Sequence, residues 1–506
     1  MTACWPTRTV KTRVETGRLL GRLHGSGVAS FRGIPYAAPP TGPRRWAPPD
    51  PASAWHGPRP AFEIGPAPLQ PQPPTNQLMW HANFADRRAL VMSEDCLYLN
   101  VWTPDVSGSG LPVLVFLQGG GNRLGHGGQE IHDGASMAGR GVIVVTLSMR
   151  LGALGFLAHP ELGAENDLGS SGNYGVLDVV AALRWVQRNI ASFGGDPGRV
   201  TLGGNSAGAA LVNHLMAAPA ARGLFQAALG QSAAGMGRAE GRTPTIEEAE
   251  EHGLAALGAM AGLPLAQLRR MPATTFLLDA PLGIVVDGRA VVEETEDVFN
   301  RGGQARIPLL AGWNVDEGAN FTPFAALDQL RTRVQQGPYA AQLRPFYPVD
   351  DANLQRSART FSGDTRFAGP VWHWACTHVR TSAAPTWVYQ FDQAPPLPTD
   401  IDLVPPPDGG AEYGSFHTAE LPYTGDNLGC RPWPWRDSDR RLATAAADAW
   451  GRFVTDHDPG HLADLSWPRF DGTHQGDTLV LGGPVRVEPV HRVEALSTVV
   501  SLPRPL

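Results

Sequence analysis

Apolar runs alternate with amphipathic segments in the first half of the chain, and this alternation constrains the fold more than any other feature. The runs are apolar on both faces, which is typical of buried strands in a parallel sheet. They lie at Leu111–Leu117, Val142–Leu147 and Arg199–Gly203. Helices are predicted at Tyr174–Phe193, where apolar residues recur every three or four positions, and at Ser206–Met216. We therefore predict an α/β fold, with a large, mostly parallel sheet covered by helices on both faces.

The flanking regions give weaker signals. Thr12–Leu23 alternates and is expected to form an edge hairpin. The elements expected after residue 235 are helices at Thr245–Met271 and Arg440–Phe453, strands at Ile307–Leu310 and Trp387–Phe391, and a proline-rich loop at Ala394–Gly410. Neither an internal repeat nor a linker divides the chain, so we expect one domain over residues 1–506.

Composition excludes several classes of function. The formal net charge of −7 gives no basic excess for binding nucleic acid.

Segments for a membrane or for secretion are not found in the sequence. No run approaches the ~20 apolar residues of a membrane span, and the N-terminus lacks the apolar core of a signal peptide. The cysteines, Cys4, Cys96, Cys376 and Cys430, form no C-x-x-C pair, so no metal site is expected. A cytoplasmic protein is the simplest interpretation, and a secreted protein whose signal has been removed is the alternative.

A candidate nucleophile lies between the third apolar run and the helix that follows it. Gly204-Asn205-Ser206-Ala207-Gly208 matches G-x-S-x-G, in which a serine sits on a sharp turn between a strand and a helix. The match alone carries little weight in a chain with 59 glycines, but the order strand, motif, helix is the one required. The alternative is a glycine-rich turn with a capping serine. We predict that Ser206 is a nucleophile.

A second glycine-rich segment, Gln118-Gly119-Gly120-Gly121-Asn122, directly follows the first apolar run. Backbone N–H groups free of side chains stabilise the oxyanion that forms when a serine attacks an ester carbonyl. A phosphate-binding loop would continue with Gly-Lys-Ser/Thr, whereas this chain continues with Arg123-Leu124-Gly125. An ordinary glycine turn remains the alternative to an oxyanion loop.

Four stretches together resemble the type B carboxylesterases, a family that includes cholinesterases and bacterial nitrobenzyl-type esterases. They are FRGIPYAAPP at Phe31–Pro40, SEDCLYLNVWTP at Ser93–Pro104, the block Gly172–Ala209 and DTRFAGP at Asp364–Pro370. The resemblance implies the α/β-hydrolase fold, with insertions at roughly 235–300 and 322–410 that shape the substrate pocket. It also implies hydrolysis of a small-molecule ester without a metal or cofactor.

The same resemblance identifies the acid and the base. The family pattern G-x-N-x-D-E-G-x-x-F matches Gly312–Phe321, which places Glu317 in the catalytic position and leaves Asp316 as its local competitor. The family pattern H-G-x-E-L-P is similar to His417–Pro422, which makes His417 the base. Two other histidines are weaker candidates for the base, His126 beyond the glycine loop and His214, which is expected to point away from the nucleophile.

In the mechanism that this implies, His417 accepts the proton of Ser206 as the oxygen attacks the ester, and Glu317 orients the imidazole. Water then cleaves the acyl-enzyme. The oxyanion donors implied are the backbone N–H groups of Gly120, Gly121 and Ala207.

Four residues near the motifs are candidates for substrate binding, and three of them depart from the family pattern. Gln118 replaces a histidine and is expected to support the glycine loop by hydrogen bonding, while Asn122 replaces an aromatic residue. Asn205 replaces a glutamate, which removes a buried carboxylate near the triad. The fourth, Arg123, makes the pocket mouth polar and favours acyl groups with a carboxylate or several hydroxyls; a solvent-facing arginine is the alternative.

A further departure concerns Cys96, which often forms a disulfide with a cysteine of an upstream loop in this family. Residues 65–70 hold no cysteine, so Cys96 is expected to be a free buried thiol.

Two other functions compete with ester hydrolysis. The same acyl-enzyme is able to transfer its acyl group to an alcohol or amine, or to close a lactone. A non-catalytic interaction protein of the same fold is the second alternative, although such proteins typically lack a triad member. The sequence indicates no oligomeric state.

Overall fold

A large mixed sheet organises the protein. The computed structural model describes residues 8–165, 169–237, 241–321, 325–399, 401, 403 and 413–503. Its strands up to residue 147 are β1 (Thr9–Val14), β2 (Gly17–Leu23), β3 (Ala29–Pro35), β4 (Pro58–Pro60), β5 (Ala67–Pro68), β6 (Met92–Ser93), β7 (Tyr98–Thr103), β8 (Leu111–Leu117) and β9 (Ile143–Leu147). Those that follow are β10 (Gly195–Asn205), β11 (Ala227–Gln231), β12 (Leu309–Asn314), β13 (Thr386–Phe391), β14 (His461–Leu462), β15 (Leu465–Ser466), β16 (Asp477–Leu481) and β17 (Arg486–Pro489).

Within the described ranges the main sheet has 13 strands, in the order β1-β2-β3-β7-β9-β8-β10-β11-β12-β13-β16-β17, with β4 beside β2. All pairs from β9 through to β16 are parallel, which confirms the predicted parallel centre. The predicted hairpin is also confirmed, because β1 and β2 pair antiparallel with Val14 opposite Gly17 at the sheet edge. Only the outer strands are antiparallel, on both sides of the parallel centre.

The central strands bury both of their faces. Along β8, Val113, Val115 and Leu117 join one core cluster, whereas Leu114 joins the cluster on the opposite face of the sheet. Successive side chains of a strand point to opposite faces. A strand whose two faces are both buried therefore reads as a continuous apolar run, which is the pattern of Leu111–Leu117.

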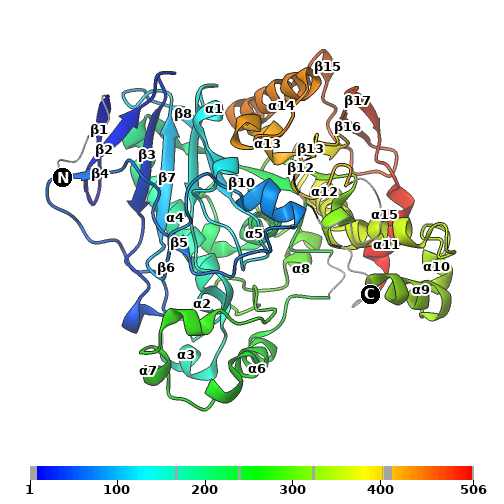
Figure 1. Ribbon diagram of the computed structural model, residues 1–506, viewed down its shortest axis with the longest axis horizontal. Helices are drawn as coiled ribbons and strands as arrows, with labels where there is room; N and C mark the ends of the chain where they lie inside the picture. The colour runs from blue at the N-terminus through cyan, green and yellow to red at the C-terminus, as the bar shows by residue number, and fades with distance from the viewer. Residues whose placement is uncertain are drawn as a thin grey trace.

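Helices cover both faces of the sheet (Figure 1). They are α1 (Ala135–Ala138), α2 (Gly152–Phe156), α3 (Pro160–Glu165), α4 (Tyr174–Asn189), α5 (Ala207–Ala217), α6 (Ile246–Leu257), α7 (Leu265–Leu268), α8 (Thr295–Asn300), α9 (Ala325–Gln336), α10 (Ala340–Leu343), α11 (Leu354–Gly363), α12 (Gly369–Ser382), α13 (Leu421–Thr424), α14 (Asp437–Asp456) and α15 (Val493–Ser501). α4, α5 and α12 belong to one core cluster with the sheet, and α14 belongs to the other. α9, α10, α11 and α15 share a separate small core at the end of the molecule where the chain ends.

Two predicted elements differ from the structure. The helix predicted over Thr245–Met271 is broken, because α6 ends at Leu257, where Gly258 takes a positive φ of 54°, and the short α7 starts only after Pro264. The predicted insertion at 322–410 is too long, since it includes β13, a strand of the central sheet. The loop predicted at Ala394–Gly410 lies outside the described residues at positions 400, 402 and 404–410.

Cys96 is a free thiol that is 2% exposed, which confirms the prediction for this residue. Burial raises the pKa of the thiol. None of the helices in the described part of the chain is both long enough and apolar enough to cross a bilayer.

A buried ion pair ties the loop after β9 to α4. Arg150 donates to both carboxylate oxygens of Asp178, at 2.8 and 2.6 Å, and their side chains are 3% and 0% exposed. The Arg150 backbone N–H also donates to Asp178 Oδ2, at 3.0 Å.

Removal of one partner should leave the other charge buried without compensation. We expect Asp178→Ala to lower the free energy of unfolding by about 3–5 kcal/mol, measured by urea denaturation. Glu293→Ala is the matched control, because it breaks the exposed pair with Arg301 and should cost less than about 1 kcal/mol. Equal effects of the two substitutions would contradict this account.

Candidate active site

Ser206 lies on a sharp turn between the end of β10 and the start of α5. Its backbone is left-handed, with φ 53° and ψ −126°, and its N–H donates to Gln231 O at 2.7 Å. A Cβ at Gly204 would lie 2.5 Å from the Gly208 carbonyl carbon, and one at Gly208 would lie 2.3 Å from Leu117 O. Close backbone contacts around the serine therefore require both glycines of the motif, and the sharp turn that the motif predicted is confirmed.

His417 and Glu317 form a buried pair. His417 Nδ1 lies 2.5 Å from Glu317 Oε2, and each side chain is 1% exposed. Glu317 lies three residues after the end of β12, and its Oε1 accepts a hydrogen bond from Asn314 N at 2.8 Å. The competitor Asp316 has another role, because its Oδ2 accepts from Ser415 N at 3.0 Å and so joins the acid loop to the histidine loop. The structure thus brings the predicted acid and base together across 100 residues of sequence.

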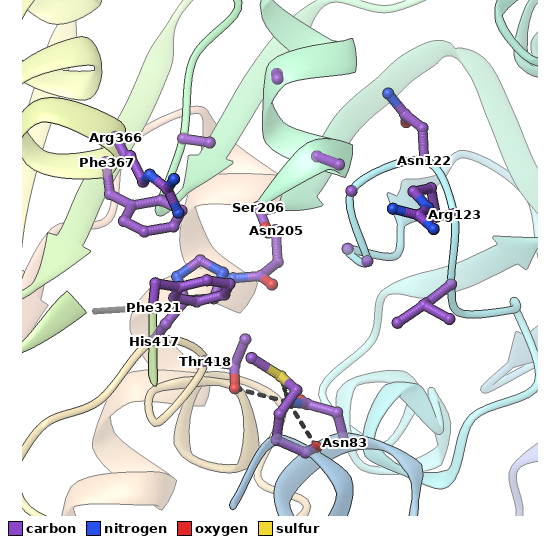
Figure 2. A pocket seen from close by; sticks show the side chains of 18 of the residues that line it. Asn83, Asn122, Arg123, Asn205, Ser206, Phe321, Arg366, Phe367, His417 and Thr418 are labelled. Carbon is purple, nitrogen blue, oxygen red and sulfur yellow. Dashed lines mark hydrogen bonds between the residues drawn. The ribbon is translucent and has the colours of Figure 1, made fainter. Parts of the chain in front are cut away.

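Two aromatic rings hold the His417 imidazole beside the serine (Figure 2). The ring centroids of Phe367 and Phe321 lie 4.3 and 5.0 Å from that of His417. His417 and Ser206 line the same cavity, but the structure of the described residues contains no hydrogen bond between them. The hydrogen bond between a catalytic base and a nucleophile is often long in the absence of substrate, and it shortens when substrate binds.

The glycine loop after β8 lies against Ser206. A Cβ at Gly119 would approach Ser206 Cβ to 2.9 Å, and one at Gly120 would lie 2.2 Å from Leu124 O. Gly120 and Gly121 have positive φ values of 116° and 62°. Among the described residues, the N–H groups of Gly120, Gly121 and Ala207 have no hydrogen-bond acceptor, so all three are available to a ligand beside Ser206.

Gln118 does not support this loop as predicted. It is 4% exposed, its Nε2 has no partner among the described residues, and it does not line the cavity. The support comes instead from Gln70 and Gln129. Gln70 Oε1 accepts from Gly125 N at 2.7 Å, and Gln129 Oε1 accepts from His126 N at 3.1 Å.

A cavity of about 570 Å³ opens in front of Ser206. Of the predicted binding residues, Asn122, Arg123 and Asn205 line it. Residues that sequence reasoning missed also line it: Met79, Asn83, Phe84, His132, Pro281–Ile284, Phe321, Arg366, Phe367 and Thr418. They come from six separate stretches of the chain. Phe321, Arg366, Phe367 and Thr418 lie within segments that resemble the family, but nothing in the sequence indicated that their side chains line the cavity.

The expectation for His214 is wrong. It lines the cavity together with Ala207 and Ala210, on one face of α5. A residue two turns along a helix returns to nearly the same face, so a position seven residues after Ala207 also faces the cavity. His214 Nδ1 lies 2.6 Å from Thr295 Oγ1. His126 does not line this cavity, and burial lowers its pKa to about 4.

A buried carboxylate remains near the site although Asn205 replaces the family glutamate. Asn205 Nδ2 donates to Glu420 Oε1 at 2.9 Å, and Asn314 Nδ2 donates to Glu420 Oε2 at 2.6 Å. Glu420 is 0% exposed. Burial, and then the charge of Glu317, raises its pKa to about 7. Sequence reasoning missed this role, although Glu420 is the glutamate of the histidine motif.

The raised pKa should make stability depend on pH. The folded state holds the Glu420 proton more tightly than the unfolded chain, so the stability that this proton contributes is present below pH 4.5 and is lost as the pH rises through about 7. The quantity to compare is the free energy of unfolding of the wild type minus that of Glu420→Gln. We expect this difference to fall by up to ~3 kcal/mol as the pH rises from 4.5 to about 7. Urea denaturation across this range measures it, and a constant difference between the two proteins would refute it.

Comparisons with known proteins agree with this architecture. A model of the carboxylesterase family matches residues 6–491. The chain belongs to the carboxylesterase family. It is similar to the fumonisin B1 esterase of Sphingopyxis macrogoltabida, with 34% identity over 90% of this chain and 84% of that protein. It is also similar to the para-nitrobenzyl esterase of Bacillus subtilis, with 33% identity over 92% of this chain and 94% of that one.

Solved structures lead to the same family. A para-nitrobenzyl (PNB) esterase superposes with a TM-score of 0.81 at 31% identity, covering 98% of this chain and 99% of its own. A Geobacillus stearothermophilus carboxylesterase superposes with a TM-score of 0.80 at 28% identity, covering 96% of this chain and 99% of its own. This carboxylesterase therefore has the α/β-hydrolase fold, and it is an enzyme that hydrolyses esters of small molecules.

Proposed function

We propose that this carboxylesterase acts through an acyl-enzyme on Ser206, with His417 as the base and Glu317 as the residue that orients it. The observation that carries the proposal is the buried contact of His417 Nδ1 with Glu317 Oε2, at 2.5 Å, on the cavity that Ser206 lines. Nδ1 is thereby committed to the carboxylate, which leaves Nε2 to exchange a proton with the serine and with the leaving alcohol.

The reaction follows from these positions. His417 Nε2 takes the Ser206 proton as the serine oxygen attacks the ester carbonyl, and Glu317 stabilises the imidazolium that results. The N–H groups of Gly120, Gly121 and Ala207 stabilise the tetrahedral oxyanion. His417 then returns the proton to the leaving alcohol, and water cleaves the acyl-enzyme by the same steps.

The charges that line the cavity support a substrate class narrower than esters in general. The cavity lining includes Arg123 and Arg366, which lie on opposite sides of Ser206 in Figure 2. Among the described residues, the lining includes no Asp or Glu. Arg123 pairs with Asp279 at 2.7 Å, but Asp279 is 96% exposed. An exposed pair of this kind contributes little and exchanges readily for another carboxylate. We infer that the preferred esters carry a carboxylate on the acyl group.

Replacement of the nucleophile should remove turnover. We expect Ser206→Ala to lower kcat for p-nitrophenyl butyrate by at least ~10³-fold, with the fold retained by circular dichroism. Ser26→Ala, at an exposed turn, is the control and should behave as the wild type. Appreciable turnover in Ser206→Ala would show that another residue is the nucleophile.

Replacement of the arginines should alter selectivity. The measurement is the ratio of kcat/KM for a hemisuccinate ester to kcat/KM for the butyrate ester of the same alcohol. We expect Arg123→Gln to lower this ratio roughly tenfold, because it removes the cation that the acyl carboxylate meets. Arg366→Gln should lower it less, because Arg366 lies on the opposite side of Ser206. Arg301→Gln, which changes an arginine of an exposed ion pair, is the control. An unchanged ratio in both variants would overturn the charge assignment and leave the nucleophile assignment intact.

A further inference from the structure

Thr418, the residue after His417, has an unfavourable backbone. Its φ of 78° lies in the left-handed region, where a β-branched side chain is strongly disfavoured. The family pattern quoted above has glycine at this position, and glycine adopts such a φ without strain. Backbone strain of this kind persists where the surrounding structure enforces it, and it gathers at functional sites.

The Thr418 side chain is buried at the cavity wall and held in one orientation. It is 5% exposed, and Asn83 Nδ2 donates to its Oγ1 at 2.9 Å (Figure 2). Asn83 is 6% exposed and also lines the cavity. The backbone of Asn83 is fixed in turn, because its carbonyl O accepts from Gln129 Nε2 at 2.8 Å.

This arrangement leaves a directed donor. A hydroxyl has one proton to donate and two lone pairs. Since Oγ1 accepts from Asn83, the Thr418 proton is available, and none of the described residues accepts it. Thr418 therefore presents a hydrogen-bond donor at the wall of the cavity.

The chemistry of the reaction assigns this wall to the leaving group. His417 has to return its proton to the leaving alcohol, so the alcohol oxygen must lie beside the imidazole. Thr418 is the next residue along the chain, and it therefore borders the substituents of that alcohol. His132 lines the same cavity, and burial lowers its pKa to about 3, so it is neutral. Asn83, His132 and Thr418 thus give the leaving group uncharged polar neighbours.

We propose that Thr418, oriented by Asn83, is a specificity residue that donates a hydrogen bond to the leaving alcohol. The enzyme then favours esters whose alcohol carries a second hydroxyl, on the carbon next to the esterified one. Monoesters of 1,2-diols are the substrate class. The proposal rests on the proposed function, because it takes His417 as the group that protonates the alcohol. It concerns the alcohol half of the ester, whereas the two arginines concern the acyl half.

The test compares 2-hydroxyethyl butyrate with propyl butyrate, in which a methyl group replaces the hydroxyl. The wild type should favour the hydroxyethyl ester in kcat/KM. Thr418→Val removes the hydroxyl and keeps the branched shape, and it should lower this preference roughly five- to tenfold, the size of one neutral hydrogen bond. Thr418→Ser should retain the preference, and Thr498→Val, on α15, should not change it.

Thr418→Gly gives a second readout. It should lose the preference and raise the melting temperature, because it removes the hydroxyl and the strain together. An unchanged preference in Thr418→Val and Thr418→Gly would overturn the proposal, as would a wild type that hydrolyses both esters equally well. A wild type that hydrolyses neither ester would instead refute the proposed function.

Discussion

The site depends on the close backbone contacts around Ser206. Gly208 places the first turn of α5 against the carbonyl of Leu117 at the end of β8, and Gly204 allows the chain to turn over that same helix. Any side chain at either position would separate the helix from the sheet. Ser206 is consequently held at φ 53° with its side chain at the cavity. The strain at the serine is imposed by packing, which also fixes the direction of its oxygen.

The parallel centre of the sheet explains why distant residues meet at this serine. β8, β10 and β12 all end at the same edge, and they are followed by the glycine loop, Ser206 and Glu317 respectively. Carboxyl ends of parallel strands gather loops into one crevice. The histidine loop is then attached by short polar contacts, since Asn314 Nδ2 donates to Phe416 O at 2.7 Å.

The local features of this design could be predicted from sequence, and the long-range ones could not. The strand at Leu111–Leu117, the turn at Ser206 and the positions of Glu317 and His417 follow from local pattern or from family resemblance. The environment of Gln118 and the direction of His214 depend on which segments pack beside them, and local pattern carries no such information. Asn205 shows the limit most clearly, since its side chain donates to the buried carboxylate of Glu420, 215 residues away, and local pattern did not indicate that contact.

The cavity in front of Ser206 is lined by both charged and neutral polar side chains. Arg123 and Arg366 line it on opposite sides of Ser206, and the neutral side chains of Asn83, His132 and Thr418 line it as well. In the proposed mechanism all of them serve a reaction at Ser206, so the identity of the nucleophile is the claim on which the account rests. The most direct measurement is labelling with a fluorophosphonate, followed by peptide mapping of the adduct by mass spectrometry. The account predicts a single adduct on Ser206, and an adduct on another residue, or none, would contradict it.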